Sequence, residues 1–131
     1  MLCGGAIGQP TDAYHEVEQE IIRGAAAVSG LPAVAGPPGW VALECHSAAM
    51  ARWLADAITR ENVEARHDGL NLLVPVSADY TLDGEIKSVI TVVAKTTDYW
   101  FNHMSPDVRR ALEMAETLDR WKARVSGWLR R

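Results

Sequence analysis

The chain contains few cysteines and no long apolar segment, and each shortage excludes a class of protein. Only Cys3 and Cys45 occur among its 131 residues, so the sequence does not encode the disulfide framework of a small secreted domain. No segment approaches the roughly 18 apolar residues that a membrane span requires. The start of the chain also lacks the basic and apolar regions of a signal peptide. We therefore expect a soluble, cytoplasmic protein with reduced thiols and no membrane partner.

Basic residues are also too few for a typical nucleic-acid-binding protein, because the formal net charge is −4. The charges are unevenly distributed along the chain. Residues 1–40 are mainly acidic, whereas residues 105–131 contain seven basic and four acidic side chains. An acidic first helix and a basic last helix could therefore lie against each other, within one chain or between two copies. Two independently solvated faces would produce the same pattern.

The remaining composition is that of an ordinary globular domain, with 48% hydrophobic and 23% charged residues. We expect one domain at residues 11–131, preceded by a flexible, glycine-rich arm at residues 1–10. Thr11 or Asp12 can cap a first helix, which the apolar spacing extends to about residue 28. Its docking face consists of Tyr14, Val17, Ile21, Ala25 and Val28. Three prolines and three glycines then predict a linker at residues 29–39.

Residues 40–76 contain the clearest fold signal, which is a strand followed by a helix and a hairpin. Residues 41–45 are strand-like. Ser47 is the expected N-cap of a helix that ends near Arg60, and Asn62 is expected to close it in a left-handed conformation. A strand, a crossover helix and a second strand predict that the two strands run parallel.

The hairpin is predicted within residues 63–76, where Asp68-Gly69 supplies a strong turn signal. Pro75 indicates that the second strand ends there or lies at an edge. Alternation along this strand predicts the residues of its core face, namely Leu70, Leu72, Val74 and Val76.

Residues 85–104 can be interpreted in two ways, and Asp83 is a candidate cap for the segment. Residues 88–94 have the β-branched density of a buried strand, whereas the apolar spacing over the whole segment fits a helix. We favour the helix because of its length. The predicted fold is therefore α+β, with a small three- or four-stranded sheet, a β-α-β-β unit, an N-terminal helix and long C-terminal helices. This layout resembles ferredoxin-like modules such as small PII-like signalling proteins. The resemblance concerns only the arrangement of strands and helices, and it implies no particular function.

The last helix is predicted from its start signal, Ser105-Pro106-Asp107, which combines an N-cap, a proline at the first helical position and an early carboxylate. Apolar residues then recur every three or four positions. Two tryptophans on such a seam require a surface to cover them, either a partner or the first helix of the same chain. The predicted interface consists of Met114, Leu118, Trp121, Val125 and Trp128.

Cys45, His46 and Ser47 lie where the first predicted strand is followed by a helix. Ligands gather at the carboxyl ends of strands, and free amides at a helix N-terminus attract anions. Arg66 could add positive charge, so the sequence predicts a small-anion site at His46, Ser47 and Arg66. In the alternative interpretation, Ser47 only caps the helix, Cys45 packs as a small apolar group and Arg66 is solvated.

Several histidines fall near the ends of predicted elements, where acid–base catalysis could use them. The candidate catalytic residues are His46, His67, Asp98, Tyr99 and His103. The cluster at residues 98–103 could equally be the wet rim of a core around Trp100. Cys45 is a candidate nucleophile with a histidine as base.

The cysteines and histidines do not have metal-ligand spacing. Cys3, Cys45, His46, His67 and His103 are the candidate ligands, but none of their spacings matches a recognised zinc motif. Neighbouring strand residues such as Cys45 and His46 also point to opposite faces. We therefore expect no metal and no cofactor.

No catalytic motif occurs in the sequence, and this absence decides the order of the functional hypotheses. The first is a non-catalytic regulatory or accessory module that forms a homo-oligomer or docks on a protein partner through its last helix, with a small anion as a further ligand. The alternatives are a small enzyme with the His/Asp/Tyr site, and a small subunit of a larger enzyme complex.

Overall fold

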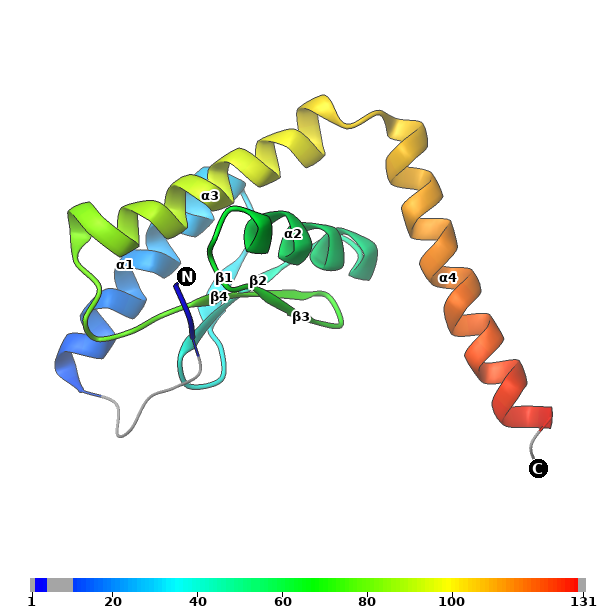
Figure 1. The fold of residues 1–131 in the computed structure, drawn as a ribbon, viewed down its shortest axis with the longest axis horizontal. Helices are drawn as coiled ribbons and strands as arrows, with labels where there is room; N and C mark the ends of the chain where they lie inside the picture. The colour runs from blue at the N-terminus through cyan, green and yellow to red at the C-terminus, as the bar shows by residue number, and fades with distance from the viewer. Residues whose placement is uncertain (1, 5–10, 130–131) are drawn as a thin grey trace.

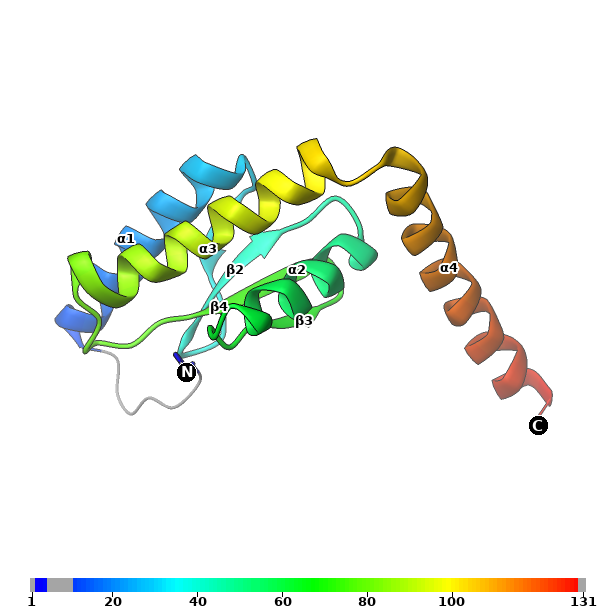
Figure 2. The ribbon, with the colours of Figure 1, turned by 45° about the horizontal axis from the view of Figure 1, so that its top comes forward.

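The computed structural model describes residues 2–4 and 11–129 and has an α+β fold around a four-stranded antiparallel sheet. The strands are β1 (Ala33–Ala35), β2 (Trp40–Glu44), β3 (Arg66–Asp68) and β4 (Asn71–Pro75), in the order β1-β2-β4-β3. The helices are α1 (Asp12–Ser29), α2 (Ala48–Arg60), α3 (Lys87–Asp98) and α4 (Pro106–Leu129), and the π-helical segments η1 (Leu82–Ile86) and η2 (Tyr99–His103) flank α3. Helices α1, α2 and α3 cover one face of the sheet, whereas α4 extends away from it (Figures 1 and 2).

The predicted helix termini are confirmed by their hydrogen bonds. Three side-chain oxygens accept a hydrogen bond of 3.1 Å from the backbone N–H three residues further on, and they belong to Thr11, Ser47 and Ser105. Asn62 follows α2 with a φ of 67°, in the left-handed region that asparagine tolerates better than most residues. These local signals therefore determined where three helices begin and where α2 ends.

The segment at residues 85–104 is helical, as we predicted from its length. The predicted cap at Asp83 is wrong, because the turn begins at Thr81 instead. The carboxylate of Glu85 accepts a 2.9 Å hydrogen bond from the Thr81 backbone N–H at the start of this turn. The fourth strand comes from β1, which lies inside the predicted linker at residues 29–39.

The prediction that the two strands joined by α2 run parallel is confirmed. β2 and β3 both pair antiparallel with β4, so they run in the same direction but are not neighbours. All three residues of β3 are polar and exposed, which suits an edge strand. Leu72, Val74 and Pro75 of β4 are buried, so β4 occupies the centre.

The hairpin between β3 and β4 forms at the predicted place, with one correction. Asp68 pairs with Asn71, so Gly69 and Leu70 are the two turn residues, and Gly69 has the positive φ (57°) that this turn requires. Leu70 was expected on the core face but is 45% exposed, because the turn interrupts the alternation before it reaches that position.

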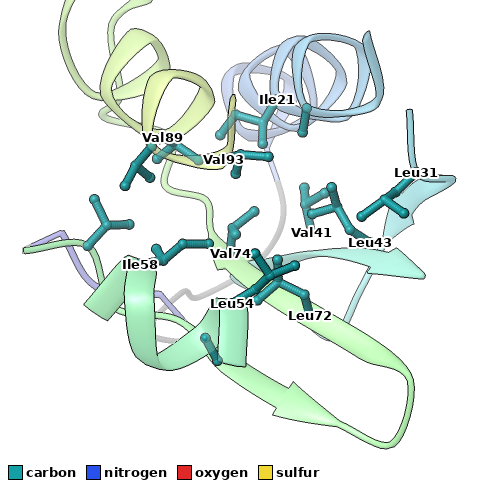
Figure 3. Packing of buried hydrophobic residues seen from close by; sticks show 14 of the residues in the cluster. Ile21, Leu31, Val41, Leu43, Leu54, Ile58, Leu72, Val74, Val89 and Val93 are labelled. Atoms are coloured by element: carbon teal, nitrogen blue, oxygen red, sulfur yellow. The ribbon is translucent and has the colours of Figure 1, made fainter. Parts of the chain in front are cut away.

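The core lies between the sheet and its three helices (Figure 3). β2 and β4 contribute alternate residues to one face of the sheet, and those residues pack against apolar side chains of α1, α2 and α3. The fully buried members include Ile21, Val41, Leu43, Leu54, Ile58, Leu72, Val74, Val89 and Val93. Of the predicted α1 face, Tyr14, Val17, Ile21 and Ala25 are buried, whereas Val28 is exposed.

The first described residues are attached to the end of α2. The Leu2 backbone N–H donates to the Asn62 carbonyl at 3.3 Å, and the Glu64 N–H donates to the Leu2 carbonyl at 2.7 Å. Residues 2–4 of the predicted arm therefore lie against residues 62–64, and the rest of the arm is outside the described residues.

Candidate functional site

Three of the five candidate catalytic residues, Asp98, Tyr99 and His103, line one cavity between α2 and the α3–η2 helix. The cavity has a volume of ≈ 390 Å³. Its lining residues are Trp53, Ala57 and Arg60 from α2, Glu61 directly after it, and Lys95, Thr96, Asp98, Tyr99 and His103 from α3 and η2. Both walls of the cavity therefore contribute polar groups.

Asp98 is the hydrogen-bonding centre of this turn. Its carboxylate accepts a 2.8 Å bond from the Asn102 amide and lies 3.0 Å from Nε2 of His103. The wider π-helical turn of η2 places residues five positions apart on one face, so His103 can reach Asp98. The hydrogen bond from Asn102, together with that from His103, holds the pKa of Asp98 below its ordinary value.

Aromatic stacking joins the two walls of the cavity. The rings of Trp53 and Tyr99 are stacked, with centroids 5.6 Å apart and planes within 10°, and the ring of Trp100 is 5.5 Å from Trp53. At the rim, Nζ of Lys95 donates to Oε1 of Glu61 at 2.8 Å. Trp53, Glu61 and Lys95 could not be assigned to a site from the sequence, because only the packing of α2 against α3 brings them together.

The Asp98–His103 pair has the geometry needed to orient an imidazole for proton transfer. Both side chains are more than half exposed, so bulk water competes for the same hydrogen bonds. The cavity therefore offers a polar, aromatic-walled surface for a small ligand.

The other two candidate histidines lie elsewhere. The ring of His46 is 5.4 Å from that of Phe101, and His46 does not line the cavity. His67 is exposed on the edge strand β3, opposite Leu72. The five residues therefore do not form one site.

Arg66 lies apart from Ser47 in the predicted anion site. Oγ of Ser47 caps α2 and donates a 3.5 Å hydrogen bond to the carboxylate of Glu113 on α4, so a negative charge already occupies that position. Arg66 pairs with Leu73, so its side chain lies on the other face of the sheet from Leu72. Its guanidinium is 4.9 Å from the centre of the Trp40 ring. These contacts match the alternative interpretation, in which Ser47 is a cap and Arg66 is solvated.

Cys45 has the environment of a core residue. Its side chain is buried, and burial raises the pKa of its thiol from 9.0 to about 12. A thiol with that pKa is protonated at neutral pH and is a poor nucleophile. Among residues 2–4 and 11–129, no three His, Cys, Asp or Glu side chains converge in a way that would hold a metal ion.

The predicted interface on α4 is exposed. Met114, Leu118 and Trp121 are 60%, 57% and 64% exposed, and they follow one another at helical spacing. α4 contacts α2, with which it lines a cavity as far along as Asp119, and then extends away from the body of the protein (Figure 2). The side chains of Val125 and Trp128, which continue the predicted seam, lie outside the described residues.

Within the described part of the chain, no helix combines the length and apolar content that a membrane span needs. The sequence matches no protein-family model and no curated protein.

Proposed function

We propose that this protein is a non-catalytic regulatory or accessory module that self-associates through the exposed face of α4. One observation carries the proposal. Three large apolar side chains, those of Met114, Leu118 and Trp121, are each more than half exposed on the same stripe of a helix that extends into solvent. Aromatic and methionine side chains in such a stripe are typical of interface cores.

A second copy of the chain is the proposed partner because the chain carries opposite charges at its two ends. Residues 1–40 are mainly acidic, and residues 105–131 are mainly basic. Opposite charges on two copies would favour association and guide the encounter. We do not extend the proposal to a small anion, because Glu113 lies beside Ser47 and Arg66 lies on the other face of the sheet.

The test is sedimentation velocity of the wild-type protein over a range of concentrations, compared with the double variant Met114→Ala/Trp121→Ala. We expect wild type to associate with rising concentration and the double variant to remain monomeric. Both substituted residues are exposed, so the variant should keep its fold, which circular dichroism verifies. Val34→Ala is the matched control, because Val34 is an equally exposed apolar residue on β1. A monomeric wild type, or an oligomer that persists in the double variant, would overturn the proposal.

The second candidate function is a small enzyme acting on an acidic or carbonyl-bearing substrate. The hydrogen bond between Asp98 and His103 beside a cavity favours it. Screening such compounds by ligand-observed NMR tests this candidate, with Asp98→Asn as the variant that should abolish binding. Binding that is unchanged in Asp98→Asn would place the ligand elsewhere, and no binding by any compound would remove the candidate.

We also propose that the sheet and its helices have a ferredoxin-like layout. The support is that α2 joins two strands of the same direction, β2 and β3, and that β4 lies between them. β1 would then supply the fourth strand, beside β2. The layout alone implies no activity.

A further inference from the structure

A second apolar surface lies at the other end of the molecule from α4, in a groove between α1 and η1. This α1–η1 groove has a volume of ≈ 740 Å³. It is lined by His15, Glu16, Val17, Gln19, Glu20, Arg23, Tyr80, Leu82 and Ile86. Val17 and Ile86 form a buried floor, whereas Leu82 is 62% exposed and therefore presents an apolar side chain that nothing in the described chain covers.

The rim of the α1–η1 groove carries two carboxylates, those of Glu16 and Glu20. In the sequence, residues 12–23 of α1 and residues 79–87 around η1 contain seven acidic and two basic side chains. One of the two basic residues, Arg23, is already paired with Glu20. The backbone N–H of Thr81 donates to Glu85 and holds the pKa of that carboxyl below its ordinary value, so Glu85 is charged at neutral pH. The groove therefore combines an apolar surface with acidic side chains beside it.

The C-terminal half of α4 has the complementary properties. Residues 120–129 of α4 contain three basic residues and no acidic residue, and two more arginines follow the helix in the sequence. Trp121, at the start of this basic segment, is the most exposed of the large apolar residues of the described chain. A basic helix with an exposed tryptophan fits an acidic groove with an exposed leucine.

The groove and the basic half of α4 cannot meet within one chain. α1 and η1 lie at one end of the molecule and α4 lies at the other in both views (Figures 1 and 2). The contact between Ser47 and Glu113 attaches α4 to the start of α2. A 24-residue helix is straight over about 36 Å and cannot fold back on itself. The α4 helix that occupies the groove would therefore have to come from another molecule.

We propose that the C-terminal half of α4 from one copy binds in the α1–η1 groove of a second copy, with Trp121 against Leu82 and the basic side chains against the acidic rim. This inference rests on the proposed function, in which α4 mediates self-association, and adds the surface that receives it. Such a contact joins two different surfaces, so each copy has one donor helix and one acceptor groove.

The experiment is a complementation test with two variants. The groove variant, Glu16→Lys/Leu82→Ala, removes one acidic and one apolar contact but keeps α4 intact. The helix variant, Met114→Ala/Trp121→Ala, keeps the groove intact. The matched control for the groove variant is Val34→Ala/Glu44→Lys, which makes the same kinds of change at exposed positions on β1 and β2. Circular dichroism verifies that every variant is folded.

We expect each of the two variants to associate about tenfold or more weakly than wild type by sedimentation velocity. An equimolar mixture should form a complex of one groove variant and one helix variant, because the mixture contains one intact groove and one intact α4. Association of wild type should weaken as ionic strength rises, because the contact is between exposed charges. The control should associate like wild type.

The other outcomes identify which idea fails. If the groove variant associates like wild type and the helix variant does not, α4 binds another surface, such as α4 of the second copy. That result would overturn this inference and leave the proposed function standing. If the mixture forms no complex although both variants are monomeric, the groove does not receive α4. If the helix variant also associates like wild type, both proposals fail.

Discussion

Replacing Tyr14 by phenylalanine should destabilise the protein through one buried hydrogen bond. The Tyr14 hydroxyl on α1 accepts a 2.8 Å bond from the backbone N–H of Gly39, next to β2, and the residue is 4% exposed. Tyr14→Phe keeps the ring and leaves the Gly39 N–H without its acceptor. Burial raises the pKa of Tyr14. An unsatisfied buried donor costs about 1–3 kcal/mol of unfolding free energy.

Urea unfolding followed by circular dichroism measures this cost. With an m-value of about 2 kcal/mol/M, a loss of about 1.5 kcal/mol lowers the midpoint by about 0.75 M. Tyr99→Phe is the control, because Tyr99 is half exposed and water can hydrate its hydroxyl. We expect that control to stay within about 0.5 kcal/mol of wild type. Equal stability of Tyr14→Phe and wild type would refute the assignment of this hydrogen bond.

Two further predictions concern pH and backbone conformation. The pKa of the Cys45 thiol is about 12 in the folded protein, against an ordinary value of 9.0 that applies to the unfolded chain. Between these two values only the unfolded chain loses the proton, so the contribution of Cys45 to stability is complete below pH 9 and is lost as the pH rises towards 12. The loss from this group at pH 11 is about 2.5 kcal/mol, and unfolding curves of Cys45→Ala should lack that part of the decline. An equally steep alkaline decline in Cys45→Ala would contradict this. Asn62 has a φ of 67°, so Asn62→Ala should cost about 1 kcal/mol, whereas Asn62→Gly should be neutral or slightly stabilising in thermal unfolding. Equal melting temperatures for the two variants would show that the left-handed conformation is not strained.

Local signals in the sequence were sufficient for the helices. Thr11, Ser47 and Ser105 cap α1, α2 and α4 as predicted, because a side-chain oxygen can satisfy a free N–H only a few residues away. The long segment at residues 85–104 is helical for a similar reason, since its apolar spacing fits one helix face over its whole length. Capping and periodicity act over short distances along the chain.

The strand order and the candidate site were decided by packing between distant segments. The sequence did not reveal that β4 lies between β2 and β3. The apolar strand β4 takes an inner position and the polar strand β3 an edge position only when the helices pack on the sheet. The sequence also missed the strand β1, a short segment between prolines and glycines that gains its hydrogen bonds only from β2.

The candidate site was also predictable from the sequence only in part. Asp98, Tyr99 and His103 could be grouped from the sequence because they lie within one helical turn. Trp53 completes the cavity from α2, and its place there depends on the angle at which two helices pack. The sequence by itself determined where α1, α2 and α4 begin, the place of the hairpin turn and the opposite charges of the two chain ends. Only the tertiary structure placed α1 and α4 at opposite sides of the molecule, because α1, α2 and α3 pack on one sheet, whereas α4 contacts α2 and then extends away from it.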